Sequence, residues 1–143
     1  MKILIYLSLC ALIHLTVFAC KTTKYSSDEL PDRQLYFGNG GGFTGAVNEY
    51  MLLDNGQLFK HDSGEYTELP KTKKKKAQAL FKTYYDLKLD SLQFRRPGNM
   101  YFYLRMKDKE QEYFTSWGNP NILPDSTIAV LYDNLMGLIR KSK

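Results

Sequence analysis

Few side chains in this chain could act as catalytic nucleophiles or as soft metal ligands. The 143 residues include two cysteines, Cys10 and Cys20, and two histidines, His14 and His61. Zinc sites built from cysteine and histidine need several such ligands, and no acidic run here has the spacing of a calcium loop. We therefore expect neither a metal nor a cofactor, and a catalytic triad would have to use His61.

Carboxylates are the remaining candidates for chemistry. Glu49, Asp54 and Asp62 could serve a small hydrolase, but no pair among them has a spacing that demands catalysis. His61 lies in the segment LFKHD at residues 58–62, which has strand character, and we expect it to pair with Tyr50 across a hairpin. Hydrolysis by these carboxylates is therefore an alternative function, and the main expectation is that no residue is catalytic.

A glycine-rich motif, GGGFTGAV, spans residues 40–47. It fits the dinucleotide-binding pattern G-x-G-x-x-G, but such a loop must open a helix, whereas the residues that follow have the pattern of a strand. We interpret residues 38–45 as a loop whose backbone needs positive φ or a close approach at the edge of a sheet. Four of its residues are also candidates for contact with a partner: Gly40, Gly41, Gly42 and Phe43.

Aromatic side chains form a second part of this candidate binding surface. The chain has 11 tyrosines and 8 phenylalanines, and Tyr101, Tyr103 and Phe114 fall on one face of a predicted strand pair. Packing in the core is the main interpretation of these rings. If no helix covers them, they form an apolar patch of the kind that binds partners.

The net charge of +5 comes from one short run of lysines. Lys71, Lys73, Lys74, Lys75 and Lys76 lie where a helix is expected to begin, and the rest of the chain is close to neutral. Nucleic-acid binding typically needs a broad basic surface, so we expect no nucleic-acid partner. The lysines are candidates for contact with an anionic lipid or polymer, and the alternative is a solvated helix start.

The N-terminus has the pattern of a lipoprotein signal. Lys2 precedes an apolar run, and Ala19-Cys20 stands where polar sequence begins. We expect residues 1–19 to be removed and the thiol of Cys20 to carry diacylglycerol and so hold the protein on a membrane. An uncleaved membrane anchor is the alternative, although the apolar run is short for one.

The remaining chain alternates between strand and helix patterns. Residues 20–34 have little apolar sequence, so we interpret them as a flexible tether to a single domain over residues 35–143. The predicted elements, in order, are strands at 35–37, 46–54 and 57–62, a helix at 71–89, strands at 100–107 and up to 117, and a helix at 124–140. This order indicates an α+β fold, with an antiparallel sheet and two helices on one face.

Turn signals predict how these strands pair. Asn55-Gly56 favours a two-residue hairpin loop, which would place Leu53 opposite Leu58 and Leu52 opposite Phe59. A second turn near residues 108–109 would give the pairs Arg105–Glu112, Leu104–Tyr113 and Met100–Trp117.

Three short segments, FGNGGGFTG at residues 37–45, PGNMY at 97–101 and Trp117-Gly118, resemble those of a group of small lipoproteins from Bacteroidota-type bacteria. The resemblance implies no particular activity, but it implies the cell envelope of a diderm bacterium. Surface-exported lipoproteins of this kind tend to carry acidic residues just after the cysteine, and none precedes Asp28 here. We therefore expect an outer-membrane lipoprotein that faces the periplasm.

Together these observations predict a non-catalytic envelope lipoprotein that binds an envelope protein or polymer. Two alternatives stay open: the small hydrolase described above, and an inhibitor of an envelope hydrolase that presents the loop at residues 38–45. Two convergent carboxylates in a pocket would favour the enzyme. A projecting glycine loop beside exposed aromatic rings would favour the inhibitor.

Overall fold

The computed structural model describes residues 23–140, in which strands, a helix, further strands and a second helix follow one another. The first elements are β1 (Arg33–Gly41), β2 (Val47–Leu52), β3 (Leu58–Asp62), β4 (Glu65–Leu69) and α2 (Lys74–Asp86). They are followed by β5 (Arg95–Arg96), β6 (Met100–Asp108), β7 (Gln111–Trp117) and α3 (Ser126–Arg140).

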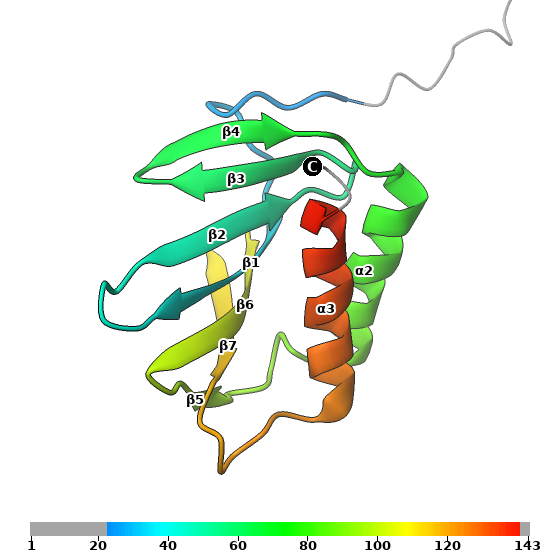
Figure 1. The fold of residues 1–143 in the computed structure, drawn as a ribbon. Coiled ribbons are helices and arrows are strands. Elements are labelled where there is room, and N and C mark those ends of the chain that lie inside the picture. The colour runs from blue at the N-terminus through cyan, green and yellow to red at the C-terminus, as the bar shows by residue number, and fades with distance from the viewer. Residues whose placement is uncertain (1–22, 141–143) are drawn as a thin grey trace, which may run out of the picture.

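All of these strands belong to one seven-stranded sheet, in the order β4-β3-β2-β1-β6-β7-β5. Neighbouring strands are antiparallel, except that the short β5 runs parallel to β7. Both α2 and α3 cover the same face of the sheet (Figure 1). The predicted α+β fold is therefore confirmed, and we call the other side of the sheet the helix-free face.

The main core lies between the sheet and the two helices. Phe37 of β1 and Tyr84 of α2 are fully buried there. The apolar stripe predicted for the last helix is buried along its whole length: Ile128, Leu131, Leu135, Leu138 and Ile139. Both predicted helices are thus present, and each begins slightly later than its sequence pattern indicated.

The glycine-rich segment differs from the prediction. β1 does not end at Phe37 but continues to Gly41, which pairs with Met100 of β6. β1 is also a central strand of the sheet, and a Cβ atom on Gly38 would lie 2.1 Å from the carbonyl oxygen of Asn48. Glycine is therefore needed here for close packing between strands, and the predicted loop at a sheet edge is wrong for this part of the motif.

The turn between β2 and β3 is one residue longer than predicted. The amide of Gly56 donates to the carbonyl of Leu53, and the amide of Leu53 donates to the carbonyl of Gln57, both at 2.9 Å. Only Gly56 in this turn has positive φ, at 91°, which is typical of a three-residue loop closed by a glycine bulge. The Asn55 side chain instead accepts from the amide of Gln57 at 2.8 Å.

This longer turn shifts the strand register by one residue, which moves side chains to the opposite face of the sheet. The structure pairs Glu49 with His61 and Tyr50 with Lys60, so the predicted pair of Tyr50 and His61 is wrong. The two leucine pairs predicted beside it are wrong for the same reason. Tyr50 packs on the main core, whereas Glu49 and His61 meet on the helix-free face.

The register between β6 and β7 is also shifted, but by two residues. Arg105 pairs with Phe114 rather than with Glu112, and the pairs predicted for Leu104 and Met100 are wrong in the same way. A shift of two residues keeps each side chain on its predicted face. The aromatic residues of these strands therefore remain on the faces that the sequence indicates.

The segment before β1 contacts the domain from residue 23 onward, unlike the flexible tether predicted for residues 20–34. Arg33 and Gln34 already belong to β1. The side chain of Gln57 accepts from the amide of Tyr25 at 2.8 Å and donates to its carbonyl at 3.0 Å. Tyr25 and Leu30 pack on a small second core on the helix-free face, formed by Tyr36, Met51, Leu53 and Phe59.

Candidate functional site

The helix-free face carries a cluster of charged and phenolic side chains from β2, β3 and β6. Glu49 is its centre, and its side chain is 13% exposed. Its Oε1 lies 2.7 Å from Nδ1 of His61 and accepts from Nη2 of Arg105 at 2.8 Å. Its Oε2 accepts from the hydroxyl of Tyr103 at 2.6 Å. We call these four residues the Glu49 cluster.

The partners of Glu49 favour its ionised form. Burial raises the pKa of this carboxyl, but hydrogen bonds from Tyr103 and His61 and the adjacent guanidinium outweigh burial and hold the pKa below its ordinary value of 4.5. Burial and the neighbouring carboxylate raise the pKa of the Tyr103 hydroxyl, which therefore stays a donor. A general base works best with a pKa near the operating pH, and Glu49 is shifted the other way.

Aromatic rings extend the Glu49 cluster. The ring of His61 stacks on that of Tyr66 with centroids 4.4 Å apart. The guanidinium of Arg105 lies 4.0 Å from the ring centroid of Tyr36. Because the hydroxyls of Tyr36 and Tyr66 are 3.0 Å apart, these contacts form a closed network.

The three carboxylates considered for hydrolysis do not converge. Glu49 belongs to the cluster, while Asp54 pairs with Arg33 at 3.3 Å and Asp62 pairs with Lys60 at 3.2 Å. Among residues 23–140, no three histidine, cysteine or acidic side chains gather closely enough to hold a metal ion. The pair of convergent carboxylates that would favour an enzyme is therefore not formed by these residues.

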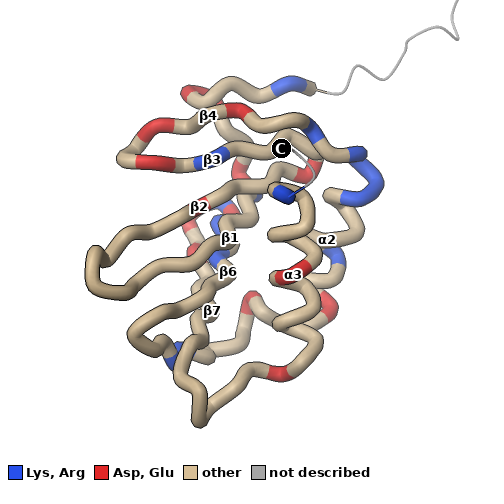
Figure 2. Tube along the Cα trace, viewed as in Figure 1, with Lys and Arg blue, Asp and Glu red and all other residues tan. Residues whose placement is uncertain are grey.

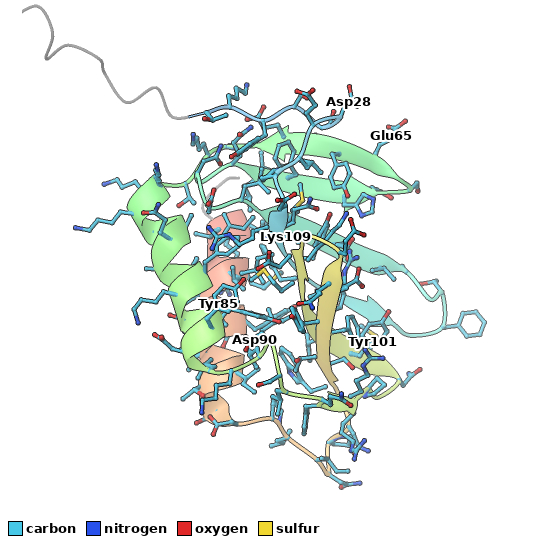
Figure 3. The ribbon with its side chains drawn as sticks, turned by 180° about the vertical axis from the view of Figure 1, so that it is seen from behind. Asp28, Glu65, Tyr85, Asp90, Tyr101 and Lys109 are labelled. Atoms are coloured by element: carbon cyan, nitrogen blue, oxygen red, sulfur yellow. The ribbon has the colours of Figure 1, made fainter. Side chains whose placement is uncertain are left out.

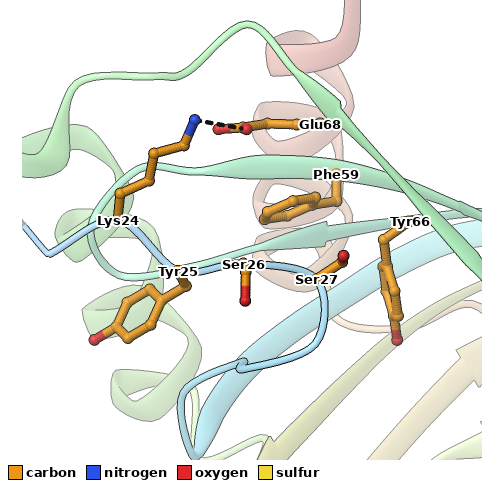
Figure 4. A pocket seen from close by; sticks show the side chains of 7 residues that line it. All are labelled: Lys24, Tyr25, Ser26, Ser27, Phe59, Tyr66 and Glu68. Carbon is orange, nitrogen blue, oxygen red and sulfur yellow. Dashed lines mark ion pairs between the residues drawn. The ribbon is translucent and has the colours of Figure 1, made fainter.

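A pocket of about 420 Å³ opens between the segment before β1 and strands β3 and β4 (Figure 4). It is lined by Lys24, Tyr25, Ser26, Ser27, Phe59, Tyr66 and Glu68. Lys24 and Glu68 form an ion pair of 3.1 Å across it, and Tyr66 connects it to the Glu49 cluster. Sequence analysis missed this pocket because one of its walls comes from the segment interpreted as a tether.

The predicted aromatic surface lies beside the Glu49 cluster, with Tyr101 toward the hairpin end of the sheet (Figure 3). Tyr103 stacks on Phe114 with centroids 5.6 Å apart, and it is only 3% exposed. Its hydroxyl occupies space left by Gly38, where a Cβ atom would lie 2.9 Å from it. Tyr103 is therefore a packing residue, while Tyr101 and Phe114 are partly exposed and available for contact.

The hairpin between β1 and β2 projects beyond the rest of the sheet (Figure 1), and residues 38–48 carry no charged side chain. Phe43 at its tip is fully exposed. Of the four predicted contact residues, Gly40 and Gly41 lie within β1, so only Gly42 and Phe43 belong to the turn. The ring of Phe43 is therefore accessible for contact with another molecule.

A further apolar surface at the start of α3 was not predicted. A pocket of about 430 Å³ lies there, and Phe102, Trp117 and Leu123 are among its lining residues. Leu123 is 74% exposed. The only sequence signal for this surface is the uncharged segment at residues 117–124, between β7 and α3.

The lysine run lies at one end of the molecule, near the start of the described chain (Figure 2). Lys74 begins α2, and Lys73 before it makes no capping hydrogen bond through its side chain. Lys71, Lys75 and Lys76 are exposed, as are the other two. None of the five forms an ion pair within residues 23–140.

Cys20, the predicted site of lipid attachment, lies outside the described residues, and so do signal residues 1–19. Neither helix of the described part, α2 or α3, has the length and apolar character that a membrane crossing requires.

Comparison with known proteins adds no relative of stated function. The chain matches no protein-family model and no curated protein. The resemblance to small lipoproteins therefore stays a prediction that depends on three short sequence segments.

Proposed function

We propose that this protein is a lipid-anchored, non-catalytic protein of the cell envelope that binds a partner protein through its projecting hairpin and the adjoining helix-free face. The observation that carries this proposal is the full exposure of Phe43 at the tip of an uncharged hairpin. Burial of a phenylalanine side chain contributes about 2 to 3 kcal/mol of favourable free energy. The exposed ring of Phe43 does not have this contribution while the hairpin is unbound. Binding of the hairpin by a partner would recover this free energy.

The Glu49 cluster supports binding rather than catalysis on the same face. The carboxylate of Glu49 already has contacts with Tyr103, His61 and Arg105. Three of the carboxylate's roughly four acceptor positions are therefore occupied, and its lowered pKa makes it a poor general base. We infer that the cluster holds β2, β3 and β6 in place beneath the surface that a partner contacts.

An envelope polymer is the alternative ligand, and the pocket of Figure 4 favours it. The rings of Tyr25, Phe59 and Tyr66 line this pocket beside serine hydroxyls, a combination that suits a sugar ring. Binding of purified envelope glycan to the parent, and its loss in Tyr66→Ala, would support this ligand.

Site-specific photo-cross-linking in cells tests the partner protein. A benzophenone amino acid at Phe43 or Tyr101 should give the same discrete cross-linked product. The same group at Lys82, which is exposed on α2, is the matched control and should give none. No discrete product from Phe43 and Tyr101, or an equally strong product from Lys82, would contradict binding through the hairpin.

Inhibition of an envelope hydrolase is a second candidate function, favoured by the projecting glycine-rich turn. A hairpin tipped by Phe43 has a shape that can enter an active-site cleft. The purified protein should then inhibit one of a panel of envelope hydrolases, and Phe43→Ser should raise the inhibition constant at least about 30-fold, as expected from the lost burial. Equal inhibition by parent and variant would exclude this role for the hairpin.

The lipid anchor is tested separately. A fatty-acid analogue should label the parent in cells and should not label Cys20→Ala, because the Cys20 thiol is the proposed acceptor. Cys10→Ala is the control and should keep the label. Equal labelling of the parent and Cys20→Ala would contradict the anchor without affecting the binding face.

A further inference from the structure

The five lysines belong to a larger basic end of the domain. The start of α2, the end of α3 and the first described residues lie at the same end of the molecule (Figure 2). Lys71 and Lys73 precede α2, Lys74 begins it, and Arg140 is the last residue of α3. Positive charge from two helices is therefore gathered where the chain enters the domain.

None of the five lysines forms an ion pair with another residue of the described part of the domain. The first turn of α2 contains no acidic residue. Its lysines lie at the positive end of the helix dipole, where positive charge is unfavourable. Glu68 is close enough for the charge of Lys71 to lower the pKa of its carboxyl, but it already pairs with Lys24 at 3.1 Å. The lysines therefore keep their charge available for a partner outside the domain.

We infer that this basic end docks on the anionic headgroups of a phospholipid bilayer and so orients the domain. The inference rests on the proposed lipid anchor in one respect. Thr23 is only three positions after Cys20 in the chain, so the start of the domain can lie no more than about 10 Å from the anchored residue. At such a distance, each lysine near the surface gains favourable interaction with anionic lipid.

This orientation turns the apolar surface away from the membrane. α3 runs from Ser126, beside the pocket of Phe102 and Leu123, to Arg140 at the basic end. Its 15 residues span about 22 Å, so the pocket lies at that distance from the docked end. The hairpin projects on the side of the sheet away from α2 and stays accessible to a partner (Figure 1).

Vesicle binding by a chain of residues 21–143 tests the docking surface without the anchor. We expect this chain to keep the fold, because it contains every core side chain of the described residues 23–140. It should bind vesicles of phosphatidylglycerol and phosphatidylcholine in equal amounts, and not vesicles of phosphatidylcholine alone. Raising the ionic strength from about 0.01 M to about 0.15 M shortens the screening length from about 30 Å to about 8 Å and should weaken the binding.

Charge-matched variants show which lysines bind. The test variant carries Lys73→Gln, Lys74→Gln, Lys75→Gln and Lys76→Gln, and its affinity for the anionic vesicles should fall about 100-fold. The control variant carries Lys82→Gln, Lys88→Gln, Lys107→Gln and Lys109→Gln, and it should lose no more than about threefold. Equal losses would overturn docking by this end, and so would a parent that binds a soluble anionic polymer but no vesicles.

Orientation is tested with single cysteines, since residues 21–143 contain none. An environment-sensitive dye on Gln78→Cys, near the start of α2, should shift its emission on anionic vesicles. The same dye on Asn121→Cys, near the apolar pocket, should not. A shift at Asn121→Cys instead would overturn this orientation, whereas failure of the lipid anchor would leave both dye results unchanged.

Discussion

Glu49 shows how one side chain can organise a sheet surface. Its two carboxylate oxygens contact the hydroxyl of Tyr103, the guanidinium of Arg105 and the imidazole of His61. These partners come from β6 and β3, the strands that flank the β1–β2 pair. The side chain is mostly buried, so its charge is only weakly screened by water. The cluster therefore contributes to stability as a unit, and its members should not be replaceable one at a time.

Glu49→Gln tests this contribution. The amide keeps the shape of the side chain but leaves Arg105 with only the more exposed carboxylate of Glu112, 3.6 Å away. The free energy of unfolding at pH 7 should therefore fall by about 2 to 3 kcal/mol. Asp54→Asn, which removes a more exposed partner of Arg33, is the control and should cost about 0.5 kcal/mol. Equal losses in urea unfolding would contradict the role of the cluster.

The pH dependence of this effect follows from the lowered pKa of Glu49. The Glu49 carboxyl binds a proton less readily in the folded protein than in the unfolded chain, where its pKa is near the ordinary 4.5. The stabilisation is therefore complete above the unfolded pKa and is lost as the pH falls through the lower folded pKa. The difference in unfolding free energy between the parent and Glu49→Gln should shrink as the pH falls below about 4.5, and a difference that grows with acid would contradict this sign.

Gly38 and Gly137 offer a matched pair of alanine substitutions. A Cβ atom on Gly38 would meet the carbonyl of Asn48, so Gly38→Ala should lower the unfolding free energy by about 2 kcal/mol. Gly137 lies in α3 with open space around it, so Gly137→Ala should raise that free energy by up to about 1 kcal/mol. If thermal unfolding showed both variants to be equally stable, close packing of β1 would not be the reason for its glycine.

At the scale of elements, the segment before β1 packs against the sheet and is hydrogen-bonded to it. Gln57 is fully buried and bonds to both backbone groups of Tyr25. The same segment covers part of the second core and forms a wall of the pocket in Figure 4. The turn that sets the strand register therefore also holds the N-terminal segment, because Gln57 follows directly after Gly56.

Gln57→Ala should release this segment and leave the sheet intact. The amide of Tyr25 loses its acceptor, so its hydrogen exchange should accelerate at least about tenfold, while the amide of Phe59 in β3 should keep its protection. Hydrogen exchange followed by NMR reports both positions in one sample. Equal acceleration at both positions would indicate global destabilisation and contradict a local release.

At the scale of the whole molecule, charge and apolar surface are separated along the two helices. The basic end holds Lys71–Lys76 and Arg140, and the opposite end of α3 holds the pocket of Phe102 and Leu123. Such a separation suits a protein that meets a membrane at its basic end and keeps its apolar pocket away from the lipid. The outer-membrane location and the periplasmic side stay predictions from the sequence.

Protease protection tests the proposed side of the membrane. Trypsin added to intact cells should leave the protein uncut, and trypsin added after permeabilisation of the outer membrane should cleave it. A known surface lipoprotein in the same cells serves as the control for protease activity. Cleavage of this protein in intact cells would contradict the periplasmic face.

The local patterns of the sequence determined where both helices and five of the seven strands lie, and which faces of β6 and β7 carry aromatic rings, but they did not predict β4 or β5. These features depend on residues a few positions apart, as in the stripe from Ile128 to Ile139. Alternation along β6 and β7 kept its faces even though the predicted pairing was shifted by two residues, because the side-chain period of a strand is two.

Only the tertiary structure decided the candidate site. The bulge at Gly56 moved Glu49 opposite His61, and the Asn-Gly signal alone did not distinguish this loop from the shorter one. Arg105 and Tyr103 reach Glu49 across β1 from more than 50 residues away in the chain. The folded position of residues 23–32 likewise depends on Gln57 rather than on any periodicity of their own. Contacts between distant segments leave no local pattern, because each half of the contact is compatible with many other partners until the chain has folded.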